Sequence, residues 1–138
     1  MNESHELARV LLEKAKGDQY IVERLANDLE APNWTFGFHA QQAVEKALKS
    51  ALCANSVAYP RTHNLAMLLE LLRLKGLPLP PDAENLPELT PFGAALRYDN
   101  DDATSPMPDL DRAWAAECVA RTVRWAEAAL NPGTHTIS

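Results

Sequence analysis

Apolar residues return at three- and four-residue steps through most of this chain, and this periodicity limits its fold more than any other feature. At such spacing the apolar side chains share one face of an α-helix. Near the N-terminus, the positions that recur in this way are Leu7, Ala8, Leu11, Ala15, Val22, Leu25, Ala26 and Leu29. We therefore predict a first helix from about Glu3 to Leu29, ended by Pro32, which disfavours helix at the residue before it.

Further helices are predicted by the same spacing together with capping residues. The predicted segments are 33–54 with Asn33 as N-cap, 65–75 capped by Thr62 or Asn64 and ended by Gly76, 91–98 with Thr90 as N-cap, and 109–130. No segment has the alternation that is typical of a half-buried strand. We expect an all-α fold, an antiparallel up-and-down bundle of four to five helices.

Length and composition narrow the class of protein. The 138 residues suit one domain over 1–138, with an ordered core of about 3–130 and a mobile C-terminal tail. A net charge of −6 argues against duplex DNA as a partner.

No apolar run is long enough to span a membrane, and the N-terminus lacks the features of a signal peptide, so we expect a cytoplasmic protein. Cys53 and Cys118 have no metal-type spacing, and we expect reduced core cysteines and no metal or cofactor.

Polar residues on apolar helix faces are the main functional signal. On the wheel of the second helix, Gln41 and Glu45 point toward a packed interface, and Asp18 lies on the apolar seam of the first helix. An unpaired buried charge is costly, so these carboxylates need partners. The expected partners are Arg97 and Arg121, with Gln41 and Tyr98 completing the hydrogen bonds. The set is either a structural polar network, which is the favoured interpretation, or a catalytic site.

Two further groups of residues have two interpretations each. His39, Lys46 and Lys49 form either a solvated helix face or a small patch for a nucleotide phosphate or a protein partner. His63 is either a helix-start residue beside Arg61 or a catalytic group. The last helix has two adjacent apolar strips, which indicate either burial between two helices of one bundle or a homodimer seam. Their members are Val119, Val123, Ala126 and Leu130, and Trp114, Cys118 and Trp125.

Three stretches carry a resemblance to a known family. They are FHAQQAVEKALKSAL, THNLAMLLELL and LTPFGAALRYD. Together with Asp18 they make the chain, from about Glu3 to Leu130, resemble the HEPN domain of bacteria and archaea. The resemblance implies a five-helix up-and-down bundle that forms homodimers. It also implies a partner, a minimal nucleotidyltransferase encoded nearby, often in a toxin–antitoxin pair.

Many members of the HEPN family are metal-independent ribonucleases, and their signature is an arginine followed, four to six residues on, by a histidine. Here Arg97 is followed by no histidine up to Ser105, and the acidic residues between them would repel an RNA phosphate. We therefore predict a HEPN-like binding and regulatory module that docks a nucleotidyltransferase-type partner or a nucleotide. Its candidate binding residues are Gln41, Glu45, Lys49, His63, Arg97 and Tyr98.

Two alternatives remain open. One is a metal-independent ribonuclease toxin with a divergent site, in which Arg97 holds the phosphate and His63 or His39 is the base. Asp18 is a further catalytic candidate. The other alternative is a purely structural dimer with no ligand of its own.

Overall fold

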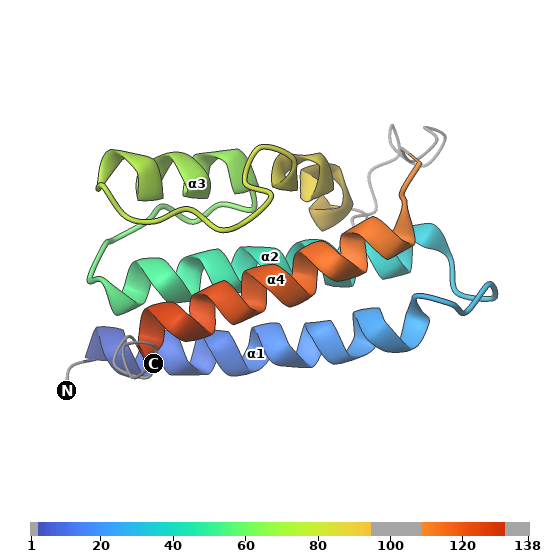
Figure 1. The fold of residues 1–138 in the computed structure, drawn as a ribbon, viewed down its shortest axis with the longest axis horizontal. Helices are drawn as coiled ribbons and strands as arrows, with labels where there is room; N and C mark the ends of the chain where they lie inside the picture. Colours follow the sequence, from blue (N-terminus) through green and yellow to red (C-terminus); the bar gives the residue numbers. More distant parts are fainter. Residues whose placement is uncertain (1–2, 95–108, 132–138) are drawn as a thin grey trace, which may run out of the picture.

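The chain is all-α in the computed structural model, which describes residues 3–94 and 109–131. The described residues form the α-helices α1 (Glu3–Leu25), α2 (Asn33–Ala54), α3 (Leu65–Leu74) and α4 (Arg112–Leu130), and the 3₁₀ helix η1 (Leu86–Ala94), with no strand among them. The three long helices α1, α2 and α4 lie side by side, and α3 and η1 form a second layer over α2 (Figure 1). The predicted helical bundle is confirmed.

The helix α2 is the centre of the fold, because every other helix packs against it. Its buried residues are Phe36, Gly37, Ala40, Gln41, Ala43, Val44, Glu45, Ala47, Leu48, Ser50, Ala51, Leu52 and Cys53. So many small side chains let neighbouring helices approach closely, and the hydroxyl of the buried Ser50 donates to the carbonyl of Ala8 in α1 at 2.7 Å.

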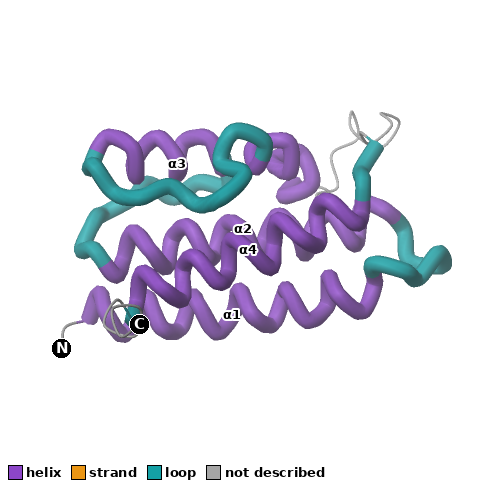
Figure 2. The backbone as a smooth tube through the Cα atoms, in the orientation of Figure 1, coloured by secondary structure: helices purple, strands orange, loops and turns teal. Residues whose placement is uncertain are grey.

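The segment after α2 turns back along that helix. His63 lies beside Gln41 and Glu45, near the middle of α2, although it follows the end of the helix by nine residues. α3 therefore starts beside the middle of α2 and runs toward its C-terminal end, as the tube in Figure 2 shows. This return path brings a loop histidine next to a buried carboxylate.

Several predicted helix ends differ from the structure, beginning with those of α1 and α2. α1 ends at Leu25 rather than Leu29, and Leu29 is 94% exposed. The side chain of Asp28 accepts a hydrogen bond from the backbone N–H of Glu30, and Arg112 of α4 donates to backbone carbonyls of the same segment, so a turn forms in place of a further helical turn. α2 begins as predicted at Asn33, but the N-cap is Pro32, and no side chain caps this end.

The other two corrections concern η1 and α4. η1 begins at Leu86, before the predicted cap Thr90, whose hydroxyl instead accepts a hydrogen bond from the N–H of Leu65. α4 begins at Arg112 rather than Asp109, because Asp111 is the N-cap and accepts from the N–H of Trp114. In contrast, the cap by Asn64 and the end of α3 at Gly76, whose φ is +70°, agree with the prediction.

The first of the two predicted apolar strips of α4 is covered within the chain, whereas in the second Cys118 is buried and Trp114 and Trp125 are half-buried against the core. Val119, Val123, Ala126 and Leu130 are buried where α4 packs against α1 and α2. Of the two interpretations of this face, burial between two helices of one bundle therefore accounts for the strip without a second copy. Cys53 and Cys118 are both buried and both free, as expected. No helix of the described residues is long and apolar enough to cross a lipid bilayer.

Candidate functional site

Glu45 is the centre of a buried polar cluster on α2. Its residue is only 4% exposed, and Gln41 beside it is fully buried, as the helical wheel predicted. The amide of Gln41 donates to Oε1 of Glu45 at 2.9 Å and to the carbonyl of His63 at 3.1 Å. The ammonium of Lys49 donates to Oε2 of Glu45 at 2.8 Å. Both carboxylate oxygens are therefore engaged inside the chain.

His63 joins this cluster from the loop before α3. Its Nδ1 lies 2.9 Å from Oε1 of Glu45, and 54% of its side chain is exposed. Of the two interpretations of this residue, the structure shows the contact that the catalytic one requires, an imidazole oriented by a carboxylate. The same contact also joins the loop before α3 to α2, as the structural interpretation requires.

Backbone packing by η1 fixes the position of Gln41. A Cβ atom on Gly93 would lie 2.6 Å from the amide carbon of Gln41, so only glycine lets η1 approach this side chain so closely. One turn earlier on α2, a Cβ on Gly37 would lie 2.3 Å from the ring of Phe92. The two glycines thus allow η1 to close the cluster from the side opposite Lys49.

A second cluster joins α1 to α2 around Asp18. Asp18 is buried, as predicted, with Oδ1 2.9 Å from Nδ1 of His39 and Oδ2 2.7 Å from Nζ of Lys46. The two clusters share one arrangement: one carboxylate oxygen contacts a histidine Nδ1, and the other contacts a lysine Nζ. Each carboxylate thus has its neutralising lysine and its histidine within the chain.

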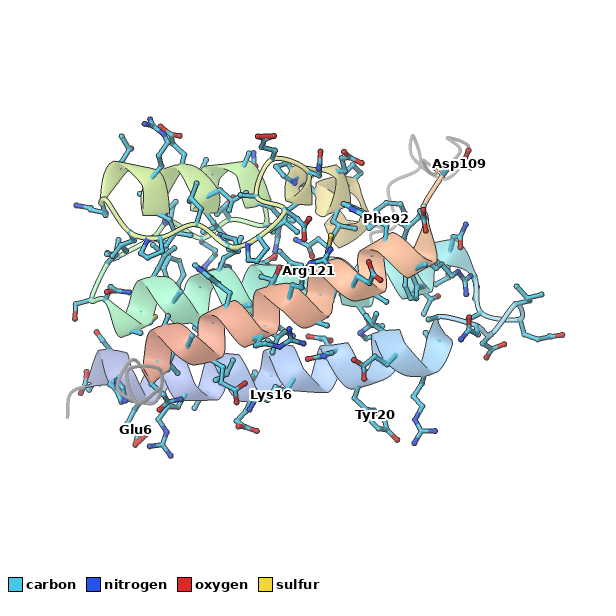
Figure 3. All side chains as sticks on the ribbon, in the orientation of Figure 1. Glu6, Lys16, Tyr20, Phe92, Asp109 and Arg121 are labelled. Carbon is cyan, nitrogen blue, oxygen red and sulfur yellow. The ribbon has the colours of Figure 1, made fainter. Side chains whose placement is uncertain are left out.

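One predicted partner of these carboxylates, Arg121, is wrong. Arg121 does not reach Asp18 or Glu45; its Nε donates to Oδ2 of Asp82 at 2.9 Å, in the loop before η1. Arg121 lies on the side of α4 that faces this second layer (Figure 3). Arg97 and Tyr98 lie outside the described residues, so their predicted contacts stay predictions.

The basic stripe of α2 is not a freely solvated face. The side chains of His39, Lys46 and Lys49 are only 25%, 26% and 13% exposed, because each contacts a carboxylate. Lys49 also lies over the ring of Tyr59, 5.5 Å from its centroid. The helical wheel placed these residues away from the core but did not reveal their partners. One signal was available: His39 and Lys46 are two helical turns apart on one face, so an acidic residue of a neighbouring helix can lie between them.

The surroundings of Glu45 keep it ionised. Burial raises the pKa of this carboxyl, but hydrogen bonds from Lys49, Gln41 and His63 together outweigh that effect, so its pKa lies below its ordinary value of 4.5. An ionised carboxylate with both oxygens occupied orients its neighbours well but is a poor proton acceptor itself.

No group of three or more His, Cys, Asp and Glu side chains within 3–94 and 109–131 is arranged to hold a metal ion. One pocket of about 340 Å³ lies between α1 and α4, lined in part by Lys16, Tyr20 and Arg124, and neither Glu45 nor Asp18 lines it.

Comparison with known proteins gives one result. The family model described as HEPN domain matches residues 8–130, which is most of the chain. Searches of curated proteins and of solved structures found no match.

Proposed function

This chain belongs to the HEPN domain family, and from that premise we propose that it is a binding and regulatory module that pairs with a nucleotidyltransferase-type protein. Proteins of this family commonly dimerise or pair with a nucleotidyltransferase. In this proposal the chain is a single cytoplasmic domain that forms a homodimer, and the pair works as a toxin–antitoxin system.

The proposal rests on one observation: in both clusters, both oxygens of the carboxylate have partners within the chain. Glu45 and Asp18 each use both oxygens on partners within the chain, and each has its own lysine. Such saturated ion pairs are typical of a structural framework, whereas a carboxylate that itself accepts a proton or attacks a substrate keeps one oxygen accessible to the reacting group. The exposed edge of His63 is the part of the cluster that remains accessible to a partner.

The partner is tested by affinity purification from the cells that produce the protein. We expect the tagged chain to recover a nucleotidyltransferase, identified by mass spectrometry, and the two purified proteins to bind each other. His63→Ala should weaken this binding at least tenfold. Lys14→Ala is the matched control, because Lys14 is an exposed cation of α1 and should leave the affinity unchanged.

Recovery of no nucleotidyltransferase by a well-folded chain would refute this function. If nucleotides also produced no thermal shift while sedimentation still showed a dimer, the purely structural alternative would be favoured. A nucleotide-dependent rise in melting temperature would instead support nucleotide binding by the module. A monomer in sedimentation at micromolar concentration would refute the homodimer.

A second candidate function, a metal-independent ribonuclease with a divergent site, is favoured by one specific observation. Glu45 orients His63 through Nδ1, and the imidazole is more than half exposed, which is the arrangement of a general base. In this mechanism Arg97 would stabilise the phosphate. We expect such an enzyme to cleave mixed RNA in EDTA, and Arg97→Ala or His63→Ala to remove the activity. No cleavage by the native dimer would exclude this candidate.

A further inference from the structure

The hydrogen-bond chemistry of Glu45 determines which nitrogen of His63 carries the proton. Nδ1 of His63 lies 2.9 Å from Oε1 of Glu45. An ionised carboxylate only accepts hydrogen bonds, so the neutral imidazole must carry its proton on Nδ1 and donate it to Glu45. The other nitrogen, Nε2, then has a free lone pair.

The free nitrogen points away from the cluster. Nε2 lies on the side of the ring opposite the carboxylate, and no described residue forms a hydrogen bond with it. With 54% of its side chain exposed, His63 presents this nitrogen to solvent. In the neutral imidazole, Nε2 can accept a hydrogen bond through this lone pair, but it cannot donate one to an anion.

We propose that Glu45 and His63 form a proton-gated anion site, in which Nε2 is an acceptor while the imidazole is neutral and binds a phosphate-type anion only after the imidazole is protonated. Protonation places N–H on Nε2 and turns the exposed edge of the ring from an acceptor into a charged donor. The inference does not depend on the identity of any protein partner.

The charged groups around His63 determine the sign of the switch. Among the described residues, Glu45 of α2 pairs with His63, Lys49 pairs with the other oxygen of Glu45, and Arg61 lies two residues before His63 in the loop; no ionisable side chain of α3 or η1 in this part of the chain forms an ion pair with it. Lys49 already neutralises Glu45, so protonation of His63 gives the cluster a net positive charge instead of completing an unpaired carboxylate. Arg61 is exposed and adds to this positive field.

The Asp18 cluster is a natural internal comparison. His39 has the same contacts, with a carboxylate on Nδ1 and a lysine on the other oxygen, but only 25% of its side chain is exposed. We expect the same tautomer at His39 and a weaker response to anions, because access to its outer nitrogen is restricted.

The tautomer is measured by nitrogen NMR on protein labelled with ¹⁵N-histidine at pH 7.5. Histidine free in water favours the proton on Nε2, so the expected Nδ1–H form is a departure that the spectrum shows directly. In Glu45→Gln, the His63 signals should move toward the free pattern while those of His39 stay unchanged. If Glu45→Gln does not fold, the native spectrum alone decides: an Nε2–H tautomer at His63 would overturn the proposal.

The dependence of anion binding on protonation of His63 is tested by titrating the native protein with inorganic sulfate at pH 5.5 and pH 7.5. Sulfate carries two negative charges at both pH values, so any difference comes from the protein. We expect the ring signals of His63 to shift with saturation at pH 5.5, at least fivefold more than at pH 7.5, and to shift less in Arg61→Ala. Equal shifts at the two pH values, or no shift at either, would overturn the proposal.

Discussion

Glu45 connects three parts of the chain through one carboxylate: Lys49 on its own helix, Gln41 one turn earlier, and His63 from the returning loop. Sequence periodicity predicted that Gln41, Glu45 and Asp18 are buried, because a helical wheel fixes which residues share a face. It did not predict their partners. Long lysine side chains reach carboxylates away from their own direction on the wheel, so the wheel misses both Lys49, which reaches Glu45 along α2, and Lys46, which reaches Asp18 across to α1.

Removing the carboxylate should destabilise the fold strongly. Glu45→Ala leaves Lys49 and Gln41 without their acceptor in a buried position, and we expect a loss of about 3 kcal/mol in the free energy of unfolding. Glu127→Ala is the matched control, because it breaks the exposed ion pair with Lys16 and should lower stability by less than about 1 kcal/mol. Urea denaturation measures both, and equal losses would contradict the burial argument.

Stability should also depend on pH through the same residue. The folded pKa of Glu45 lies below its ordinary value of 4.5, so its ionised form stabilises the fold at pH values above 4.5. This contribution is lost as the pH falls below 4.5 and the carboxylate of the folded protein becomes protonated. We therefore expect the stability difference between the native chain and Glu45→Gln to shrink between pH 6 and pH 3 in urea denaturation. A constant difference would show that Glu45 does not titrate differently on folding.

The turn between α1 and α2 is held by a contact from a distant part of the chain. Arg112, the first residue of α4, donates hydrogen bonds to the carbonyls of Leu25, Asp28 and Ala31. This explains why the α1–α2 turn could not be predicted locally: its carbonyls are satisfied by a residue more than eighty positions away. The cap of α3 was predictable because Asn64 acts on its own helix. η1 was placed wrongly because a 3₁₀ helix has about 3.0 residues per turn, so the spacing that identifies an α-helix does not mark where it begins.

The role of Arg112 leads to a direct test. Arg112→Ala removes hydrogen bonds from a charged donor to the turn, and we expect a loss of about 2 kcal/mol in the free energy of unfolding. Hydrogen exchange should become faster at residues 26–31 in particular. Arg112→Lys, which keeps the charge but not the planar fork, should restore only part of the protection. Unchanged exchange in the alanine variant would show that the turn holds its own shape.

Two glycines on long helices should respond in opposite directions to the same substitution. Gly37→Ala places a methyl group against the ring of Phe92, so we expect a loss of about 1–3 kcal/mol in stability. Gly17 lies in α1, and no atom lies within 4 Å of the place that a methyl group would take there, so Gly17→Ala should stabilise by up to about 1 kcal/mol. The melting temperatures of the two variants, measured by thermal unfolding, check both predictions. A loss in Gly17→Ala would indicate that another chain covers this surface.

The helical class of the fold followed from the sequence because periodicity persists over long segments, and the packing of α1, α2 and α4 follows from the faces that it defines. The return of the chain after α2 did not follow, because the segment 55–64 carries no periodic pattern and its path is fixed by contacts with Gln41 and Glu45. The closeness of His63 to Glu45 was unpredictable for the same reason.

Both layers share α2, so we expect the chain to unfold as one cooperative unit. Trp34 reports on α2, Trp114 and Trp125 report on α4, and circular dichroism reports on all helices together. The urea transitions observed by tryptophan fluorescence and by circular dichroism should coincide. Separate transitions would mean that α3 and η1 detach before the long helices, which would contradict a single domain.

The rate at which Cys118 is alkylated reports how often the core opens locally. Its thiol is fully buried on α4, and burial together with the nearby Asp82 raises its pKa to about 11. An alkylating reagent reacts with the thiolate, so at neutral pH it can label Cys118 only during moments when α4 lifts from the bundle. The labelling rate therefore measures how often α4 opens. A ligand that stabilises the bundle will lower this rate without contacting the cysteine.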